Sequence, residues 1–284
     1  MKDTLTQKNT TKAFDVEESI RKKFHTTIFS KFCKAINEYE LLKPGDKVAV
    51  CISGGKDSML MAKLFQELKK HNKFPFEVEF IVMDPGYNSK NRALIESNAN
   101  MLEIPVHIFE TDIFENVVNI DKSPCYLCAR MRRGNLYKQA KELGCNKIAL
   151  GHHYDDVIET ILMGMLYGAQ IQTMMPKLHS TNFEGMELIR PLYLIREKDI
   201  IRWKEYNGLQ FLQCACKFTD LSTNHNEELS KRKVIKNLIA KLKEENPQVE
   251  ANIFRSVENV NLSTIIAYKD QDKKRHNFLD NYDN

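Results

Sequence analysis

A glycine-rich hexapeptide between two differently patterned segments constrains the fold of this chain most strongly. Residues 47–52, before it, are apolar and predict a buried strand, whereas residues 57–71, after it, have the apolar spacing of an amphipathic helix. Adjacent glycines at such a junction let the backbone approach a phosphate group, which the free N–H groups and the positive end of the helix can hold. The alternative is a turn that binds no ligand. We expect a nucleotide to bind here, in contact with Ser53, Gly54, Gly55, Lys56, Asp57 and Ser58.

Strand and helix patterns alternate along the following part of the chain. This alternation predicts an α/β fold, with a parallel five-stranded sheet covered by helices on both faces. Ligands of such sheets bind beyond the carboxyl ends of the strands, where the hexapeptide lies. The expected strands are residues 47–52, 78–83, 106–109, 147–150 and 187–189, and the expected helices are about 57–71, 89–103, 125–143 and 155–168.

Three segments follow from these patterns. Residues 1–42 form an N-terminal helical segment, with one or two helices in residues 13–42. Residues 43–225 form the sheet domain, and residues 226–284 form a charged helical extension. The last dozen residues are polar, and we expect them to fray.

Composition places the chain among ordinary globular proteins, at 42% hydrophobic and 28% charged residues. No apolar run approaches the roughly 18 residues that span a membrane, and residues 1–12 lack an apolar signal core. We therefore expect a cytoplasmic protein with no membrane partner. The net charge is only +4, but basic residues cluster at residues 21–23, 130–133, 231–233 and 273–275. Each cluster fits either a nucleic-acid phosphate backbone or a solvated helix face.

A second motif, residues 151–156, follows the fourth expected strand and should face the same nucleotide. Asp155 and Asp156 open the next helix, where either could accept a proton or hold Mg²⁺ together with Asp57. Alternatively, Asp155 only caps that helix and the two histidines before it make local hydrogen bonds. The geometry favours a functional role for Asp156, which lies one residue further into the expected cleft.

The seven cysteines have two expected roles. Cys33, Cys51 and Cys145 lie in apolar or helical surroundings and are expected to be core residues. Cys125 and Cys128 share one face at a helix N-terminus, where their thiol pKa values should be lowered. Zinc, a redox pair and an iron–sulfur cluster all use this spacing, but no second ligand pair completes a closed zinc site. Three thiolates around a cubane cluster would leave one iron open.

Taken together, the motifs resemble the tRNA 2-thiocytidine synthetase family of PP-loop ATP pyrophosphatases. The resemblance covers about residues 20–260 and implies an adenine-nucleotide α-hydrolase-like fold. It also implies an ATP-dependent tRNA sulfurtransferase that forms AMP and pyrophosphate. ATP would adenylate the C2 oxygen of an anticodon-loop cytidine, position 32 in that family, and sulfur would replace this oxygen through a [4Fe-4S] cluster. The motifs that carry the resemblance are residues 53–58, 125–134, 148–156, 174–178 and 189–192.

By this resemblance, Cys125 and Cys128 are the first two cluster ligands. The third is Cys214, by its spacing from the Arg-Pro-Leu segment at residues 190–192, and Cys216 is the alternative. Arg132 follows Cys128 by four residues on the same helix face, so we expect it to face the reaction.

Lys56, the loop N–H groups and Mg²⁺ would neutralise the departing pyrophosphate. Asp57 and Asp156 are the expected magnesium ligands, and Asp156 is also a catalytic candidate. Met83 and Gly151 are the remaining expected nucleotide contacts. Residues 83–88 depart from the longer loop of the family near the adenine, which leaves the exact substrate open.

Other functions remain open at this point. A tRNA 2-thiouridine synthetase shares the chemistry, but its zinc-finger ends are absent, which favours cytidine. A lysidine-type synthetase shares the adenylation but needs no cysteine cluster. A non-enzymatic nucleotide or redox sensor could use the same fold. The expected partners are tRNA, ATP and a sulfur donor such as a cysteine desulfurase persulfide or free sulfide, and a homodimer is one of the open oligomeric states.

Overall fold

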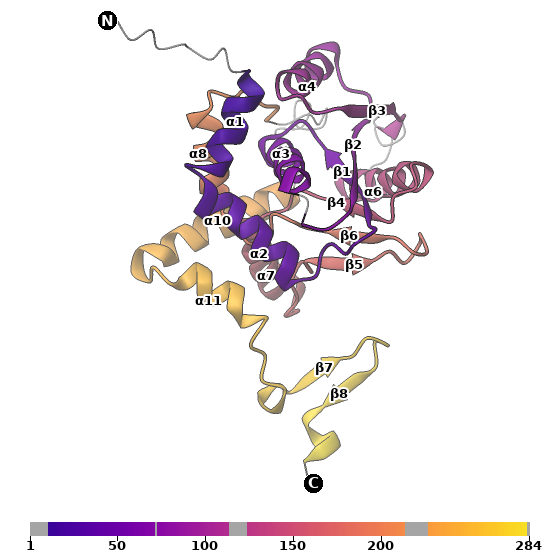
Figure 1. Ribbon diagram of the computed structural model, residues 1–284. Helices are drawn as coiled ribbons and strands as arrows, with labels where there is room; N and C mark the ends of the chain where they lie inside the picture. Colours follow the sequence, from indigo (N-terminus) through magenta and orange to yellow (C-terminus); the bar gives the residue numbers. More distant parts are fainter. Residues whose placement is uncertain (1–10, 72, 114–123, 214–226, 283–284) are drawn as a thin grey trace, which may run out of the picture. The chain divides into compact units, whose positions relative to one another are not determined.

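The computed structural model describes residues 11–71, 73–113, 124–213 and 227–282 (Figure 1). These residues fall into two compact units, one of residues 1–157 with 174–230 and one of residues 158–173 with 231–284. The first unit contains the sheet and both motifs of the expected nucleotide site.

The sheet of the first unit has six strands in the order β3-β2-β1-β4-β6-β5. Five of them are parallel, and β5 pairs antiparallel with β6. The expected α/β fold is confirmed, but the expected number of five strands is wrong. The strands are β1 (Lys47–Ile52), β2 (Glu77–Asp84), β3 (Val106–Glu110), β4 (Lys147–Ala149), β5 (Lys177–His179) and β6 (Glu187–Ile189).

The missed strand, β5, is a three-residue edge strand with Leu178 exposed. Because one edge is unpaired and little of it is buried, it lacks the apolar pattern that reveals a core strand. It is recognisable only through its register with β6, in which Leu178 lies opposite Leu188.

Helices cover both faces of the sheet, because the side chains of β1 are buried on both faces and alternate between two cores. Val48, Val50 and Ile52 face the larger core, which α3 and the N-terminal helices complete. Ala49 and Cys51 face the opposite core, which is closed by α6 (Figure 1). The helices of this unit are α1 (Lys12–Arg21), α2 (Ser30–Glu38), α3 (Lys56–His71), α4 (Ser89–Met101), α6 (Pro124–Glu142) and α8 (Glu197–Tyr206), and a π-helical turn (His25–Phe29) joins α1 to α2.

An ion network joins α1 to α3. Lys63 of α3 is fully buried and donates hydrogen bonds to Glu17 of α1, at 2.7 Å, and to the carbonyl of Leu102, at 2.9 Å. Arg21 donates to both carboxylate oxygens of Glu67, at 3.0 and 2.9 Å. A buried lysine is stable only with such partners, so this network fixes the N-terminal helix against the helix of the hexapeptide.

Helix α7 (Tyr154–Gly168) begins in the first unit and ends in the second. The second unit also contains most of α10 (Glu227–Glu245), α11 (Val249–Ser256), a turn of 3₁₀ helix (Leu262–Thr264), and the hairpin of β7 (Ala267–Lys269) and β8 (Arg275–Asn277), which a second 3₁₀ turn (Phe278–Asn281) follows. The expected helices after residue 225 are confirmed. The hairpin differs from the helical end that was expected, and fraying of the last dozen residues stays a prediction.

Asp270 holds the turn of this hairpin. Its carboxylate accepts a hydrogen bond from the Lys274 amide at 2.9 Å and lies 2.8 Å from Nε2 of His276. These contacts close the hairpin turn and join it to β8. No helix among the described residues is both long enough and apolar enough to cross a membrane.

Candidate functional site

The hexapeptide forms a tight loop between β1 and α3. Gly54 adopts a φ of +82°, a conformation that favours glycine, and its carbonyl accepts a hydrogen bond from the Leu212 amide at 3.1 Å. The Ser58 hydroxyl donates to the Gly55 carbonyl at 3.0 Å and accepts from the Ser53 amide at 3.1 Å. The loop is therefore held by its own serines, with the N-terminus of α3 directed toward it.

The second motif lies beside this loop. Strands β1 and β4 are neighbours, and the chain crosses from one side of β1 to the other between β3 and β4. This is the switch point of the sheet, where α/β proteins bind ligands. Gly151, just after β4, packs so closely that a methyl group on it would lie 3.3 Å from the Ser58 amide nitrogen. The structure thus brings together the two motifs that the sequence separates by almost 100 residues.

Lys56 lies between two carboxylates at this site. Its ammonium is 3.2 Å from Asp57 and 3.2 Å from Glu197, the first residue of α8. Burial alone would lower the pKa of Lys56, but the two carboxylates outweigh burial and raise it. Lys56 is therefore a charged group, already positioned beside the loop.

Asp57 carries the most unusual carboxylate of the site. Burial raises its pKa, an effect that Lys56 and His153 partly oppose. Its Oδ1 is buried, has no hydrogen-bond partner, and lies 3.9 Å from Nε2 of His153. A buried carboxylate oxygen without a donor suits a cation, so the side chain fits the expected magnesium ligand.

Asp155 and Asp156 have different surroundings. Asp155 accepts two hydrogen bonds from Arg196, at 3.3 and 3.0 Å, and one from the Glu197 amide at 2.6 Å. It therefore caps the start of α8 rather than its own helix. Asp156 accepts from the His153 amide at 3.0 Å, a capping contact at the start of α7. Both carboxylates lie in the motif that adjoins the loop.

The remaining predicted nucleotide and catalytic residues lie around β2. The side chain of Met83 is buried in a small core with Ile113, so only its backbone is available to a ligand. Arg132 of α6 is half-buried, and its guanidinium lies 3.5 Å from the Tyr87 hydroxyl. Tyr87 follows Asp84, the last residue of β2. This contact connects the cysteine-bearing helix to the loop after β2.

Asp84 fixes the start of that loop. Its carboxylate accepts hydrogen bonds from the amides of Gly86 and Tyr87, at 2.9 and 2.7 Å, and from Arg92 at 2.7 Å. Burial would raise the pKa of Asp84, but these donors outweigh burial and lower it.

The structure describes the surroundings of the three cysteines that were expected to be core residues. Cys51 and Cys145 are buried in the core beneath α6, and Cys33 is half-buried against the larger core. Burial raises the pKa of Cys51 well above that of a free thiol and the pKa of Cys145 to about 11, so both remain protonated and are poor metal ligands. Cys125 and Cys128 lie in the first turns of α6. Cys214 and Cys216 lie outside the described residues.

Sequence reasoning missed α8, which supplies Glu197 and one wall of a cavity beside the loop. The sequence did contain a signal for this helix, since the apolar residues Ile200 and Trp203 have helical spacing. The structure shows both side chains buried. The cavity has a volume of about 370 Å³ and is lined by Gly55, Lys56, Asp57, Ile201, Lys204, Phe211, Leu212 and Gln213.

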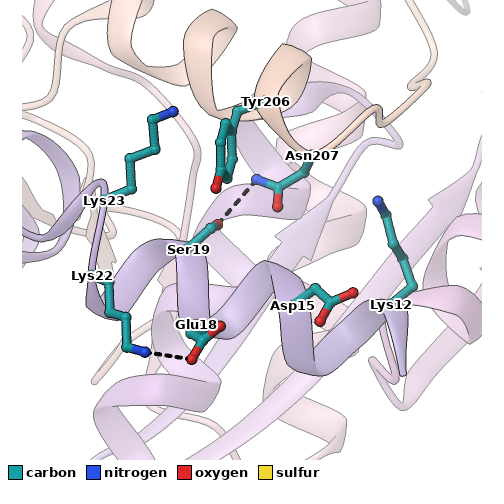
Figure 2. A pocket seen from close by; sticks show the side chains of 8 residues that line it. All are labelled: Lys12, Asp15, Glu18, Ser19, Lys22, Lys23, Tyr206 and Asn207. Carbon is teal, nitrogen blue, oxygen red and sulfur yellow. Dashed lines mark hydrogen bonds and ion pairs between the residues drawn. The ribbon is translucent and has the colours of Figure 1, made fainter. Parts of the chain in front are cut away.

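A second cavity, of about 450 Å³, lies between α1 and the end of α8 (Figure 2). Two of the three lysines that line this cavity have partners among its other lining residues. Lys22 donates to Glu18 at 2.7 Å, and the ammonium of Lys23 lies 3.7 Å from the ring centroid of Tyr206. None of its lining residues belongs to the two motifs, so we assign it no part in the site.

Comparison with known proteins identifies the family. A PP-loop domain model matches residues 24–243. A tRNA-cytidine(32) 2-sulfurtransferase from Coxiella burnetii is 36% identical over 239 residues, which are 83% of this chain and 90% of that protein. The chain belongs to the tRNA-cytidine(32) 2-sulfurtransferase family.

Two further proteins agree with this family assignment. A relative of the same name from Janthinobacterium sp. is 34% identical over 91% of this chain and 78% of its own length. A solved structure of a U34-tRNA thiolase from Methanococcus maripaludis, with its [4Fe-4S] cluster, superimposes with a TM-score of 0.65 at 24% identity, covering 85% of this chain and 78% of that one. The latter likeness supports the PP-loop fold that the sequence motifs predicted.

Proposed function

We propose that this protein is an ATP-dependent tRNA sulfurtransferase that converts cytidine 32 of tRNA to 2-thiocytidine. One observation carries the proposal: the phosphate loop and the Gly151–Asp156 motif meet at the sheet switch point in a member of the 2-sulfurtransferase family. The two motifs place an anion site and carboxylates next to each other at one edge of the sheet. Adenylation of a base can use both groups, the first for the phosphates of ATP and the second for Mg²⁺.

The first step forms an adenylated base. The C2 oxygen of the cytidine attacks the α-phosphorus of ATP, the bond between that phosphorus and the bridging α,β-oxygen breaks, and pyrophosphate leaves. Backbone N–H groups of Gly54 and Gly55 and the ammonium of Lys56 neutralise the charge on the departing group. In the second step, sulfide attacks C2 and AMP leaves with the former base oxygen.

Asp57 and Asp156 are the residues that would hold Mg²⁺, which would neutralise phosphate charge when bound. The unpartnered Oδ1 of Asp57 supports this assignment. Asp155 is held by the charged Arg196 side chain and by the amide of Glu197, whereas Asp156 accepts from the amide of His153 within its own motif, so we propose Asp156 as the better candidate of the pair.

Cys125 and Cys128, with Cys214 as third ligand, would hold a [4Fe-4S] cluster, whose open iron would supply the sulfide. The thiols of one helical turn fit such a group, and Arg132, four residues after Cys128, favours thiolates there. The U34-tRNA thiolase of similar fold contains a cluster of this kind. We propose Arg132 as the residue that faces the reaction, held in place by Tyr87.

Basic residues outside the nucleotide site would hold the tRNA. The target base lies within a folded loop, so it must be unstacked and turned into the cleft. We assign the phosphate contacts to Arg130, Arg132 and Arg133 and to residues 231–233. In the latter group Arg232 lies 3.4 Å from Glu159 and Lys231 lies over the Tyr167 ring, while Lys233 is exposed.

We place the reaction in the cytoplasm. The sulfur source is free sulfide, or a cysteine desulfurase persulfide whose outer sulfur a two-electron donor such as a thiol reduces to sulfide.

The decisive assay mixes anaerobically purified protein with tRNA, ATP and sulfide. AMP, pyrophosphate and 2-thiocytidine should form in equal amounts, and mass analysis of tRNA nucleosides from cells lacking the gene should show loss of 2-thiocytidine. ADP and phosphate as products would disprove the mechanism. Loss of 2-thiouridine instead would assign a different base.

Cysteine substitutions test the cluster assignment separately. Anaerobic protein should contain iron and absorb as a brown cluster, and Cys125→Ala, Cys128→Ala and Cys214→Ala should each abolish this absorption. Cys216→Ala is the matched control, which should retain it. The reverse result for Cys214 and Cys216 would exchange their roles, and one tightly bound zinc without iron would disprove the cluster.

Neutralising the basic residues 231–233 tests the proposed tRNA contacts. Lys231→Gln, Arg232→Gln and Lys233→Gln combined should weaken tRNA binding and flatten its salt dependence, with ATP binding unchanged. An unchanged salt slope would show that residues 231–233 are only a solvated helix face.

A further inference from the structure

The cavity of about 370 Å³ beside the phosphate loop combines a charged wall with an apolar one. Gly55, Lys56 and Asp57 bring the loop and the start of α3 into it, and Lys204 faces them from α8. Ile201, Phe211 and Leu212 complete the lining with apolar atoms, and Gln213 also lines the cavity. An apolar wall lowers the local dielectric and strengthens charge interactions inside the cavity.

Lys204 differs from the other cations around the loop. Lys56 is paired with Asp57 and Glu197, and Arg196 is paired with Asp155. Lys204, in contrast, is half-buried and makes neither an ion pair nor a hydrogen bond with any residue that the structure describes. Among the charged side chains that line the cavity, Lys204 is the one that no described residue pairs, because Lys56 and Asp57 pair with each other. A partly desolvated ammonium without a counterion favours an anionic ligand.

We propose that Lys204 is a second phosphate-binding cation, which acts beside Lys56 on the β- and γ-phosphates of ATP and then on the released pyrophosphate. The inference rests on the proposed function, because adenylation is the step that releases pyrophosphate. The volume lies near the lower end of the range of ligand pockets, roughly 300–1,000 Å³, which suits a small anion better than a polynucleotide. Lys204 would thus neutralise part of the negative charge that develops on the leaving pyrophosphate.

Calorimetric titration of the full chain with inorganic pyrophosphate, a nonhydrolysable ATP analogue and AMP tests this assignment. Lys204→Gln should weaken pyrophosphate and analogue binding about tenfold, which corresponds to roughly 1.4 kcal/mol. AMP binding should not change, because AMP lacks the two terminal phosphates. Lys204→Arg should restore most of the affinity, since it returns the charge.

Arg202→Gln is the matched control. Arg202 lies on the same helix, carries the same charge, is exposed and pairs with Asp199 at 3.4 Å, but it does not line the cavity. Equal losses of pyrophosphate affinity in both Gln variants would overturn the proposal, because a general field effect would then explain them. It would also be overturned if Lys204→Gln bound pyrophosphate like the wild type, or lost only tRNA affinity.

These titrations need neither tRNA nor sulfide. If the protein bound pyrophosphate through Lys204 but did not thiolate tRNA, the role of Lys204 would be supported and the proposed function would be wrong.

Discussion

Replacing Gly54 by alanine should destabilise the phosphate loop for two separable reasons. An alanine at φ +82° pays a backbone strain of about 1–2 kcal/mol. Its methyl group would also lie 2.6 Å from Cγ1 and 3.0 Å from Cδ1 of Ile95, and overpacking of this kind costs about 1–3 kcal/mol. We therefore expect Gly54→Ala to lower the free energy of unfolding by about 2–5 kcal/mol, a large part of a typical total of 5–15 kcal/mol.

Gly55→Ala is the matched control, one residue along the same loop. A methyl group there would meet its nearest neighbours, the Leu212 carbonyl and the Ser53 hydroxyl, at 3.7 Å, which is ordinary contact. Gly55 also lies outside the left-handed region. The free energy of unfolding of the Gly55→Ala variant should differ from that of the wild type by less than about 1 kcal/mol. Urea unfolding of the two variants, followed by circular dichroism, measures the difference.

A double-mutant cycle with Ile95→Ala separates the clash from the backbone strain. Ile95→Ala alone should cost about 2–5 kcal/mol, because it leaves a cavity. In the double variant the methyl group no longer meets Ile95, so the combined loss should be smaller than the sum by about 1–3 kcal/mol. Strict additivity, or equal losses for Gly54→Ala and Gly55→Ala, would refute the close packing on which this reasoning depends.

Three further predictions concern carboxylates around the site. Glu17→Gln leaves Lys63 buried without a counterion and should lower the free energy of unfolding by about 3 kcal/mol, measured by urea unfolding at pH 7. Asp84 has a folded-state pKa below the unfolded value, so its contribution to stability is present above about pH 4 and is lost as pH falls through the folded-state pKa. Asp84→Asn should therefore flatten the loss of stability on acidification below about pH 4, whereas an unchanged acid profile would contradict the assigned shift. Asp155→Asn weakens the contacts with Arg196 and the cap of α8, and should lower the stability of the ligand-free protein by about 2 kcal/mol in a thermal melt, whereas an unchanged melting temperature would contradict these contacts.

The sequence by itself determined the central part of the fold and the location of the site. The β1 strand, the glycine pair and α3 follow from local patterns, since an apolar run, a glycine pair and helical spacing each restrict the nearby backbone. The meeting of the hexapeptide with Gly151 also follows, because carboxyl ends of parallel strands share one edge of the sheet. The buried thiols of Cys51 and Cys145 could be recognised from their apolar neighbours.

Only the tertiary structure decided which side chains surround the loop. Glu197 and Lys56 are separated by 141 positions in the chain, yet their side chains lie 3.2 Å apart because α8 packs beside α3. Asp155 caps α8 rather than its own helix for the same reason. Lys204 has no distinguishing sequence pattern, and its exposure to a cavity depends on how α8 lies against the loop. Such contacts depend on the packing of distant elements, which local patterns of hydrophobicity and charge do not encode.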